Sequence, residues 1–267
     1  MAWANFWHTL KQHRNQIWLW GGGLAFLALL LIGMVGDMGL IESYAQIMES
    51  LPDELMSAFG ADMAAISTPD GFIAFGFFSY ILIIIAIYAV NAGLDIVATD
   101  EDEGMLDIVL TLPVLRRQLV IERFLAFAVI TVSILLVSFI GFVIGAQFTT
   151  FEMNLGGMFL GIISLIPSTL FIIVLVVLCS VIFRRKSSAL AVAVVIILVS
   201  YFVDMLAMTT TNDVIQAMSY LSFFTYSKSQ AVVTDGVIWR DLAVLGVATG
   251  ALFLLTLYLF DRRDVGL

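Results

Sequence analysis

The sequence predicts an all-α protein that crosses a membrane several times. Of its 267 residues, 61% are hydrophobic and 12% are charged, and the mean hydropathy is +1.06. A water-soluble domain carries about a quarter charged residues, so most of this chain must face lipid or other apolar helices. The formal net charge of −9 also argues against nucleic acid as a partner.

Six apolar runs are long enough to cross a bilayer, which takes about 20 apolar residues. We expect the spans at Ile17–Val35, Phe72–Ala98, Phe124–Ala146, Met158–Phe183, Ala189–Met208 and Trp239–Phe260. The basic stretch Arg184-Arg185-Lys186 separates the fourth span from the fifth, because adjacent cations inside hydrocarbon are costly. Pro167, inside the fourth span, is tolerated in a membrane helix as a kink. The sequence contains no repeat or soluble domain, so residues 1–267 form a single transmembrane domain.

Positive charge sets the expected orientation of the six spans. Lys and Arg gather in both termini, in the 99–123 segment and in the basic turn, whereas the opposite loops hold only Lys228 and Arg240. Cytoplasmic loops are enriched in these residues, so both termini are predicted to be cytoplasmic in a plasma or inner membrane. The first outer loop is acidic, and its helical apolar spacing predicts two short outer helices broken near Ser50.

The N-terminal residues predict an amphipathic helix in the cytoplasmic interface. Its apolar face repeats at three- and four-residue spacing, with cations close by, in Trp3, Phe6, Trp7, Leu10, Lys11 and Arg14. The apolar run that follows is long and lacks a small-residue cleavage site, so we interpret it as a retained span rather than a signal peptide.

The most polar stretch between two spans is Thr99–Arg123. An acidic turn opens a short amphipathic helix from about Gly104, Pro113 ends this helix, and an Arg pair follows, as the helix dipole prefers. Such a structured, charged segment predicts a docking surface. The alternative is an interfacial helix that only lies on lipid, but the acidic start argues against it because the inner leaflet is itself negative.

This segment resembles the cytoplasmic segment after the second span in permease subunits of type-2 ABC transporters, most of which are exporters. The family pattern is an acidic residue, a Gly, a few apolar residues, then Pro and a nearby Arg. The matching residues are Glu103-Gly104-Met105-Leu106-Asp107 and Leu112-Pro113-Val114-Leu115-Arg116. Met105 stands where a Thr is usual, and Leu115 stands where a Ser or Thr is usual. The resemblance continues through Leu51–Leu55, Phe59-Gly60, Pro69–Phe72 and Phe260–Asp264, and so covers essentially the whole chain.

The resemblance implies a half-transporter. Two permease subunits would pair, as a homodimer or a heterodimer, and each would bind a separate ABC ATPase subunit through a coupling helix. The residues implied in this coupling are Glu103, Gly104, Asp107, Pro113 and Arg116. The chain has no G-x-x-x-x-G-K-[ST] loop, so it is predicted not to be an enzyme and to bind no cofactor, with ATP and Mg on the partner ATPase.

Three polar residues inside spans are candidates for a transport pathway or a gate. Asn91 and Asp95 lie four apart near the cytoplasmic end of the second span, and Asp204 lies well into the fifth span. An intramembrane carboxylate is a functional candidate by default. Asp204 can also sit close to the outer interface and be simply hydrogen-bonded, and Asp95 can pair with Arg116 or the basic turn.

Two other functions compete with the exporter interpretation. A stand-alone secondary transporter or channel would use the acidic residues as an ion relay, although no pair of broken helices appears in corresponding halves. An intramembrane enzyme has less support, because neither H-E-x-x-H nor G-x-S-x-G occurs. His8 and His13 lie on the N-terminal helix, and Cys179 fits a structural thiol better than a metal ligand or nucleophile. The strongly apolar spans favour a hydrophobic or amphipathic substrate.

Overall fold

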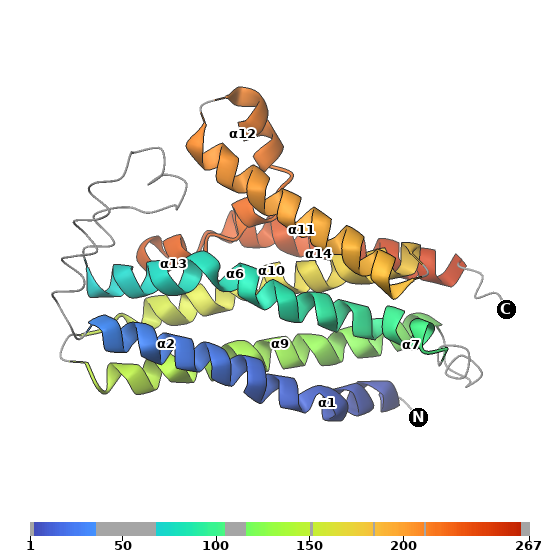
Figure 1. The fold of residues 1–267 in the computed structure, drawn as a ribbon, viewed down its shortest axis with the longest axis horizontal. Helices are drawn as coiled ribbons and strands as arrows, with labels where there is room; N and C mark the ends of the chain where they lie inside the picture. The colour runs from blue at the N-terminus through green and yellow to red at the C-terminus, as the bar shows by residue number, and fades with distance from the viewer. Residues whose placement is uncertain are drawn as a thin grey trace.

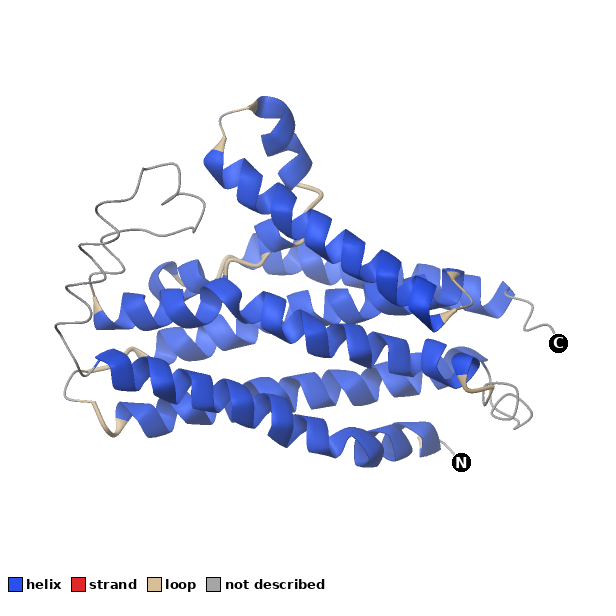
Figure 2. Cartoon of the chain, viewed as in Figure 1, coloured by secondary structure: helices blue, strands red, loops and turns tan. Residues whose placement is uncertain are grey.

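The computed structural model describes residues 3–35, 68–104, 116–149, 152–183, 185–210 and 212–262. Throughout these ranges the regular secondary structure is helical and contains no strand (Figure 2). Six of the helices are long and apolar enough to cross a membrane (Figure 1). The predicted class, an all-α polytopic membrane protein with six spans, is confirmed.

The observed spans agree with the predicted ones to within a few residues at most ends. They are α1 (Ala4–Gln16) continued by η1 (Ile17–Gly21) and α2 (Gly22–Val35), then α6 (Pro69–Ile96), α9 (Arg116–Ala146), α10 (Leu155–Ile182), α11 (Lys186–Thr209) and α14 (Trp239–Arg262). Shorter helices are α7 (Ala98–Asp102), α12 (Asp213–Ser219), the 3-10 helix η2 (Phe224–Tyr226) and α13 (Ser229–Asp235).

Two spans differ from the sequence expectation. α9 begins at Arg116, eight residues before the predicted Phe124, because the charged residues that precede the apolar run continue the same helix. The predicted N-terminal amphipathic helix forms as α1, but it is continuous with the first span through the π-helical turn η1 rather than separated from it. α1 packs along α9, and this contact explains why it follows the bundle.

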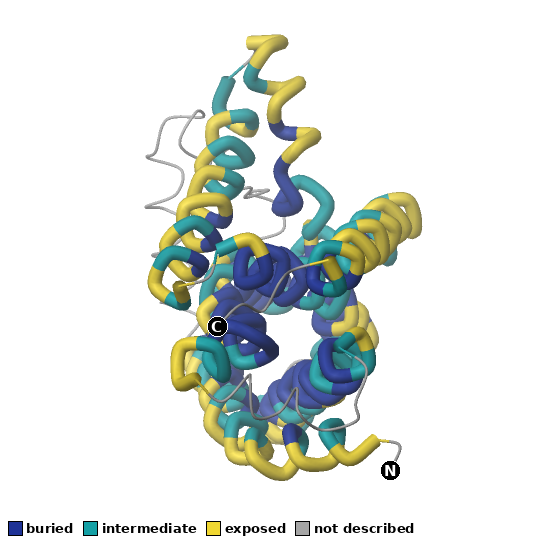
Figure 3. Tube along the Cα trace, turned by 90° about the vertical axis from the view of Figure 1, so that its right-hand side faces the viewer, coloured by how far each residue is buried: buried dark blue, intermediate teal, exposed yellow. Residues whose placement is uncertain are grey.

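The core of the bundle is the pair α6 and α10. In their most apolar windows, 67% of α6 and 61% of α10 is buried, compared with 17% of α11 and 11% of α14. α10 packs against both α6 and α14, while α9 packs against α1 and α2 (Figure 1). Seen end-on, the buried residues gather along the inner helices, and α11 and α14 lie outside with much of their surface exposed (Figure 3).

Local sequence signals explain several helix ends. Thr68 caps α6, with its hydroxyl oxygen accepting from the Gly71 N–H at 3.1 Å, and Pro69 occupies the first turn, where its missing N–H costs nothing. Asn154 caps α10 in the same way through the Gly157 N–H at 2.9 Å. α10 continues through Pro167, as a membrane helix can.

The two ends of the bundle differ in composition. At one end, which we call the basic end, α1 begins, α7 follows α6, α9 begins, α11 begins and α14 ends (Figure 1). α10 ends at Ile182 and α11 begins at Lys186, so the predicted tight turn between them is present there. The opposite end, the far end, carries α12 and α13. The predicted outer helices of residues 40–63 and the predicted coupling helix after Gly104 lie outside the described residues.

Close helix approach depends on small residues at a few positions. A Cβ atom on Gly141 of α9 would lie 2.4 Å from the Ala25 carbonyl oxygen and 2.6 Å from its Cα atom, both backbone atoms of α2. Gly246 on α14, by contrast, has open space where a Cβ atom would stand. Close packing on a small residue therefore operates within this bundle at Gly141, whereas a Cβ atom at Gly246 would contact nothing in the described chain.

Gly141→Ala should push α2 away from α9. Overpacking a tight contact costs about 1–3 kcal/mol, so we expect the melting temperature in mild detergent to fall by several degrees. The matched control is Gly246→Ala, which should leave the melting temperature unchanged or raise it slightly because Ala favours helix. Equal melting temperatures for the two variants would contradict the α2–α9 contact.

Candidate functional site

The segment predicted to dock a partner is only partly described, but both of its ends are in place. Glu103 and Gly104 follow α7 and are exposed, and Arg116 is the first residue of α9. Asp107 and Pro113, the other two predicted coupling residues, lie outside the described residues. Gly104 has φ +68°, the left-handed conformation that commonly ends a helix, so it redirects the chain after α7.

Arg123 holds the two ends of this segment together. Its guanidinium, on α9, pairs with the Asp100 carboxylate of α7 at 2.5 Å. It also donates to the backbone carbonyls of Ile96 at 2.9 Å and Asp95 at 3.5 Å, where α6 ends. We call these contacts the Arg123 clamp. Both side chains are mostly buried, with 13% of Arg123 and 16% of Asp100 exposed, so removing one partner would leave the other charge poorly solvated.

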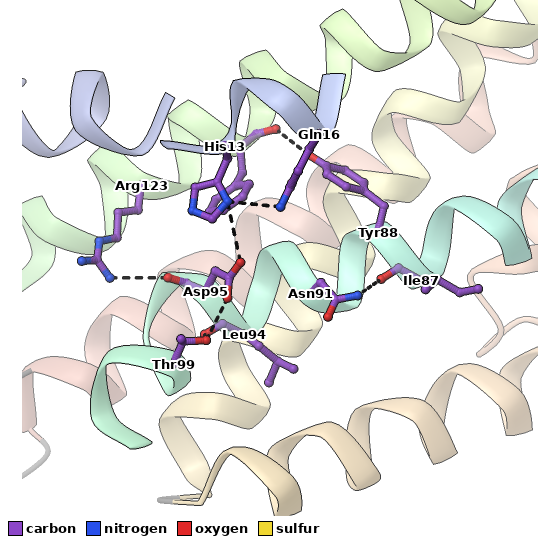
Figure 4. Close-up of polar contacts among 10 residues, drawn as sticks. His13, Gln16, Ile87, Tyr88, Asn91, Leu94, Asp95, Thr99 and Arg123 are labelled. Atoms are coloured by element: carbon purple, nitrogen blue, oxygen red, sulfur yellow. Dashed lines mark hydrogen bonds and ion pairs between the residues drawn. The ribbon is translucent and has the colours of Figure 1, made fainter. Parts of the chain in front are cut away.

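Asp95 connects the N-terminal helix α1 to the end of α6, next to the Arg123 clamp. Its carboxylate lies 3.9 Å from His13 Nδ1 on α1 and accepts from the Thr99 hydroxyl at 2.8 Å (Figure 4). The partner expected from the sequence, Arg116 or the basic turn, is replaced by His13, because α1 runs alongside α9 and reaches α6 there. His13, assigned to the N-terminal helix without a role, thus contacts a predicted site residue.

Asn91 and Asp95 share one face of α6, as their spacing predicts. Beyond its first turn, the exposed and half-exposed residues of this otherwise buried helix, apart from Ser79, form a single row, the open stripe: Gly76, Tyr80, Ile83, Ile84, Ile87, Asn91 and Asp95. α6 lies between α2 and α11, and contacts both (Figures 1 and 4). Asn91 is exposed, and its amide donates to the Ile87 carbonyl of its own helix at 2.8 Å. The stripe therefore carries the exposed amide of Asn91 on a face that this subunit covers only in part, at Gly76 through Leu31 and at Asp95 through His13.

Glu122 is a site residue that the sequence interpretation missed. Only 4% of it is exposed, and its carboxylate accepts the backbone N–H groups of Trp3, Asn5 and Phe6 at 3.0–3.3 Å. These are donors at the start of α1 that have no partner within the helix. The carboxylate of α9 thus caps α1, and its charge matches the positive end of the helix dipole. The sequence shows an acid, Glu122, next to Arg123. Its capping role could not be predicted, because the backbone groups that it binds lie more than a hundred residues away.

The end of α14 is also tied to the basic end. Arg117 on α9 forms an ion pair with Asp261 on α14, and the Arg262 guanidinium lies 4.4 Å from the centre of the Tyr258 ring. Asp261 and Arg262 belong to the C-terminal motif Phe260–Asp264. Phe260 itself is fully buried, so the motif both anchors the last helix and brings its charges beside α9.

At the far end, Asp204 takes part in a second polar system. It lies five residues before the end of α11, is half-buried, and accepts from the Thr225 hydroxyl at 2.6 Å. The segment of residues 212–235 between α11 and α14, the far-end segment, turns back so that α13 packs against α10 and α6. Each of five polar contacts joins a span to this segment: Ser200–Ser222 at 2.9 Å, Asp204–Thr225 at 2.6 Å, Ser168–Ser227 at 2.7 Å, Ser164–Ser229 at 2.8 Å and Ser79–Gln230 at 3.1 Å.

The described residues hold no group of three or more His, Cys, Asp and Glu side chains suited to a metal ion. Cys179, the sole cysteine of the sequence, is buried within α10. Asp204 is far along the chain from the Asn91–Asp95 pair and lies at the opposite end of the bundle, so the three predicted pathway residues form two separate sites.

Six apolar helices with polar clusters at both ends define a multi-pass membrane protein. The sequence profile of the family described as ABC-2 family transporter protein matches residues 3–265, and the chain belongs to this family. The family is a membrane permease component of ABC transporters, so the resemblance inferred from the 103–116 segment is confirmed. A comparison with curated proteins found no match.

The capping role of Glu122 is directly testable. Glu122→Gln removes the charge that stabilises the start of α1, and losing such a cap costs about 0.5–2 kcal/mol. We expect amide hydrogens of α1 to exchange about two- to thirtyfold faster, measured by mass spectrometry, with α10 unaffected. Glu152→Gln, an exposed acid outside the spans, is the control and should leave α1 unchanged. Unaltered exchange in α1 of the Glu122 variant would disprove the cap.

Proposed function

We propose that this chain is the membrane subunit of an ATP-driven exporter and that a separate ABC ATPase subunit binds between α7 and α9. The observation that carries the proposal is the Arg123 clamp, which fixes both ends of the 103–116 segment to the end of α6 and the start of α9. A displacement of that segment is therefore passed to two spans at once. Membership of the ABC-2 family supports the same partner.

Glu103, Gly104, Asp107, Pro113 and Arg116 transmit the displacement in this proposal. Two copies of the ATPase approach each other when they bind ATP with Mg, and they hold the two permease subunits in a different packing. A ligand can shift a conformational equilibrium only by binding one state more tightly than the other. The chain therefore has to supply a firm mechanical connection, and it needs no nucleotide site of its own.

The orientation proposed for the chain places the basic end in the cytoplasm of a plasma or inner membrane, with both termini there. The cations at this end, including Arg117 and Arg123, agree with the enrichment of Lys and Arg in cytoplasmic loops. The ATPase then meets the 103–116 segment on the side where ATP is present.

A second permease subunit covers the open stripe of α6 in the assembled transporter. Polar side chains within a membrane face a bundle interior or a water-filled cavity rather than lipid. Asn91, exposed on one subunit, satisfies that rule if a second copy of this chain or a related chain lies opposite. The substrate then passes between the subunits, with Asn91 and Asp95 beside its path. The exposed apolar residues of the same stripe, Tyr80 and Ile87, favour a hydrophobic or amphipathic substrate.

Asp204 acts as a gate residue through the far-end segment. With its hydrogen bond to Thr225, it holds this segment against α11, and four further side-chain pairs hold it against α6, α10 and α11. A single side-chain hydrogen bond contributes about 1 kcal/mol. The five bonds together therefore hold the segment firmly, while each one alone is easily broken and replaced by another. Such contacts suit a segment that moves to release substrate.

A secondary transporter or channel is the second candidate. The observation that favours it is the chain of polar groups His13, Asp95 and Thr99 at the end of the open stripe, since such groups can relay ions or protons. Transport by the purified chain alone under an ion gradient, without ATP, would support this function over the exporter.

Docking of the ATPase is tested by reversing charge at Glu103. We expect Glu103→Lys, alone or with Asp107→Lys, to abolish co-purification of an ATPase subunit from native membranes, because the acidic start of the segment would repel the surface that it now attracts. Glu152→Lys serves as the control and should retain the ATPase. Wild-type recovery of the ATPase with the Glu103 and Asp107 variants would contradict the docking site.

Movement of the far-end segment is tested by a reversible cross-link. Ser164→Cys with Ser229→Cys, in a Cys179→Ser background, places two thiols where the hydroxyl oxygens lie 2.8 Å apart. We expect oxidation to suppress ATP turnover of the purified permease–ATPase complex and reduction to restore it. Each single Cys variant is the control. Full turnover by the cross-linked complex would show that this segment need not move.

A further inference from the structure

A narrow pocket at the far end adjoins the polar contacts of the far-end segment, with which it shares Ser164 and Ser227. It lies where α10, the chain after η2 and the start of α14 meet. Its lining consists of hydroxyl, charged and apolar residues: Ser164, Tyr226, Ser227, Lys228, Val232, Ile238, Asp241 and Leu242. Hydroxyl and charged groups therefore lie beside the aliphatic side chains of Val232, Ile238 and Leu242 in this pocket.

The pocket contains one positive and one negative side chain that are not joined to each other. Lys228 is exposed and Asp241 is half-buried. Within the described ranges neither side chain forms a hydrogen bond or an ion pair at contact distance, although Lys228 lies close enough to Asp204 for the two charges to interact. The hydroxyl groups, by contrast, already have partners, since Ser164 bonds Ser229, Ser227 bonds Ser168, and Tyr226 donates to the Tyr220 carbonyl. The groups left for a ligand are the two opposite charges.

The pocket lies at the depth of lipid headgroups. It includes Ile238 and Asp241, which flank the first residue of α14, where this membrane span begins. Trp239 at that position is 77% exposed, and Ile238 is 38% exposed. Exposed Trp residues at span ends are typical of the membrane–water interface. A phospholipid in the adjoining leaflet therefore brings its headgroup to this pocket without leaving the bilayer.

We propose that the pocket binds the headgroup of a zwitterionic phospholipid that carries a primary amine. The ammonium group enters toward the half-buried Asp241, while the phosphate stays outside on the exposed Lys228. The acyl chains then run along the apolar side of α14 beside Leu242. The cavity volume of about 10 Å³ suits a group the size of a primary ammonium, which donates three hydrogen bonds, better than a bulky trimethylammonium group, which donates none. An anionic headgroup, which has a phosphate but no ammonium group, would place a negative charge beside the Asp241 carboxylate and would be repelled.

The test measures lipids bound to the purified full chain in mild detergent, by native mass spectrometry. The protein is offered equal amounts of phosphatidylethanolamine, phosphatidylcholine and phosphatidylglycerol. We expect wild type to retain phosphatidylethanolamine preferentially. Asp241→Asn keeps the shape of the side chain but removes its charge. The preference for phosphatidylethanolamine should fall about tenfold, which is the effect of losing one charge-assisted hydrogen bond. The bound lipid should shift toward phosphatidylglycerol. Lys228→Met should weaken binding of all three lipids, because each of them carries a phosphate.

The control variants are Asp213→Asn and Lys186→Met, which change the same charges away from the pocket and should match wild type. A wild-type protein that does not distinguish phosphatidylethanolamine from phosphatidylcholine overturns the proposal. So does an Asp241→Asn variant with the lipid profile of wild type. Gel filtration of each variant shows that a changed profile comes from folded protein. None of these outcomes depends on the ATPase partner.

Discussion

Much of this structure depends on the contacts that the Arg123 guanidinium makes with α6 and α7. Arg123 stands where α9 enters the membrane, and it binds both the end of α6 and the first acid of α7. Backbone carbonyls at a helix C-terminus have no partner within the helix and carry partial negative charge, so a cation is stabilised there.

Around this guanidinium, charged and polar contacts join four helices at the basic end, in addition to apolar packing such as that of the buried Phe260. Glu122, one residue before Arg123 on α9, caps α1. Asp95 on α6 faces His13, which also lies on α1. Arg117 brings in α14 through Asp261. Apolar packing inside a membrane gains little over lipid and so gives weak direction, whereas paired charges fix particular positions. This accounts for a firm scaffold next to the segment expected to receive an external force.

The spans could be predicted from sequence because their signal is local. An apolar run of sufficient length specifies a membrane helix wherever it occurs, and caps such as Thr68 mark its start. The clamp, the cap by Glu122 and the pairs of the far-end segment could not be predicted in this way. Each joins residues far apart in sequence, such as Glu122 with Asn5 or Ser164 with Ser229, and a serine in an apolar run carries no information about its partner. Asn91 and Asp95 were placed on one face because both lie on one helix, where spacing alone decides.

The π-helical turn at Ile17–Gly21 determines which residues of the first span face the neighbouring helices. The inward residues Thr9, His13, Ile17 and Gly21 are four apart, and on a straight α-helix such a series would rotate by about 40° at each step. A wider turn absorbs part of that rotation, so that one continuous rod presents His13 to α6 and Gly21 to α9. The chain thus carries one residue more than an ordinary helix needs there. Loss of a single residue from this turn would twist everything before it by about 100° and carry the imidazole away from its carboxylate. The length of this short stretch is therefore as constrained as its composition.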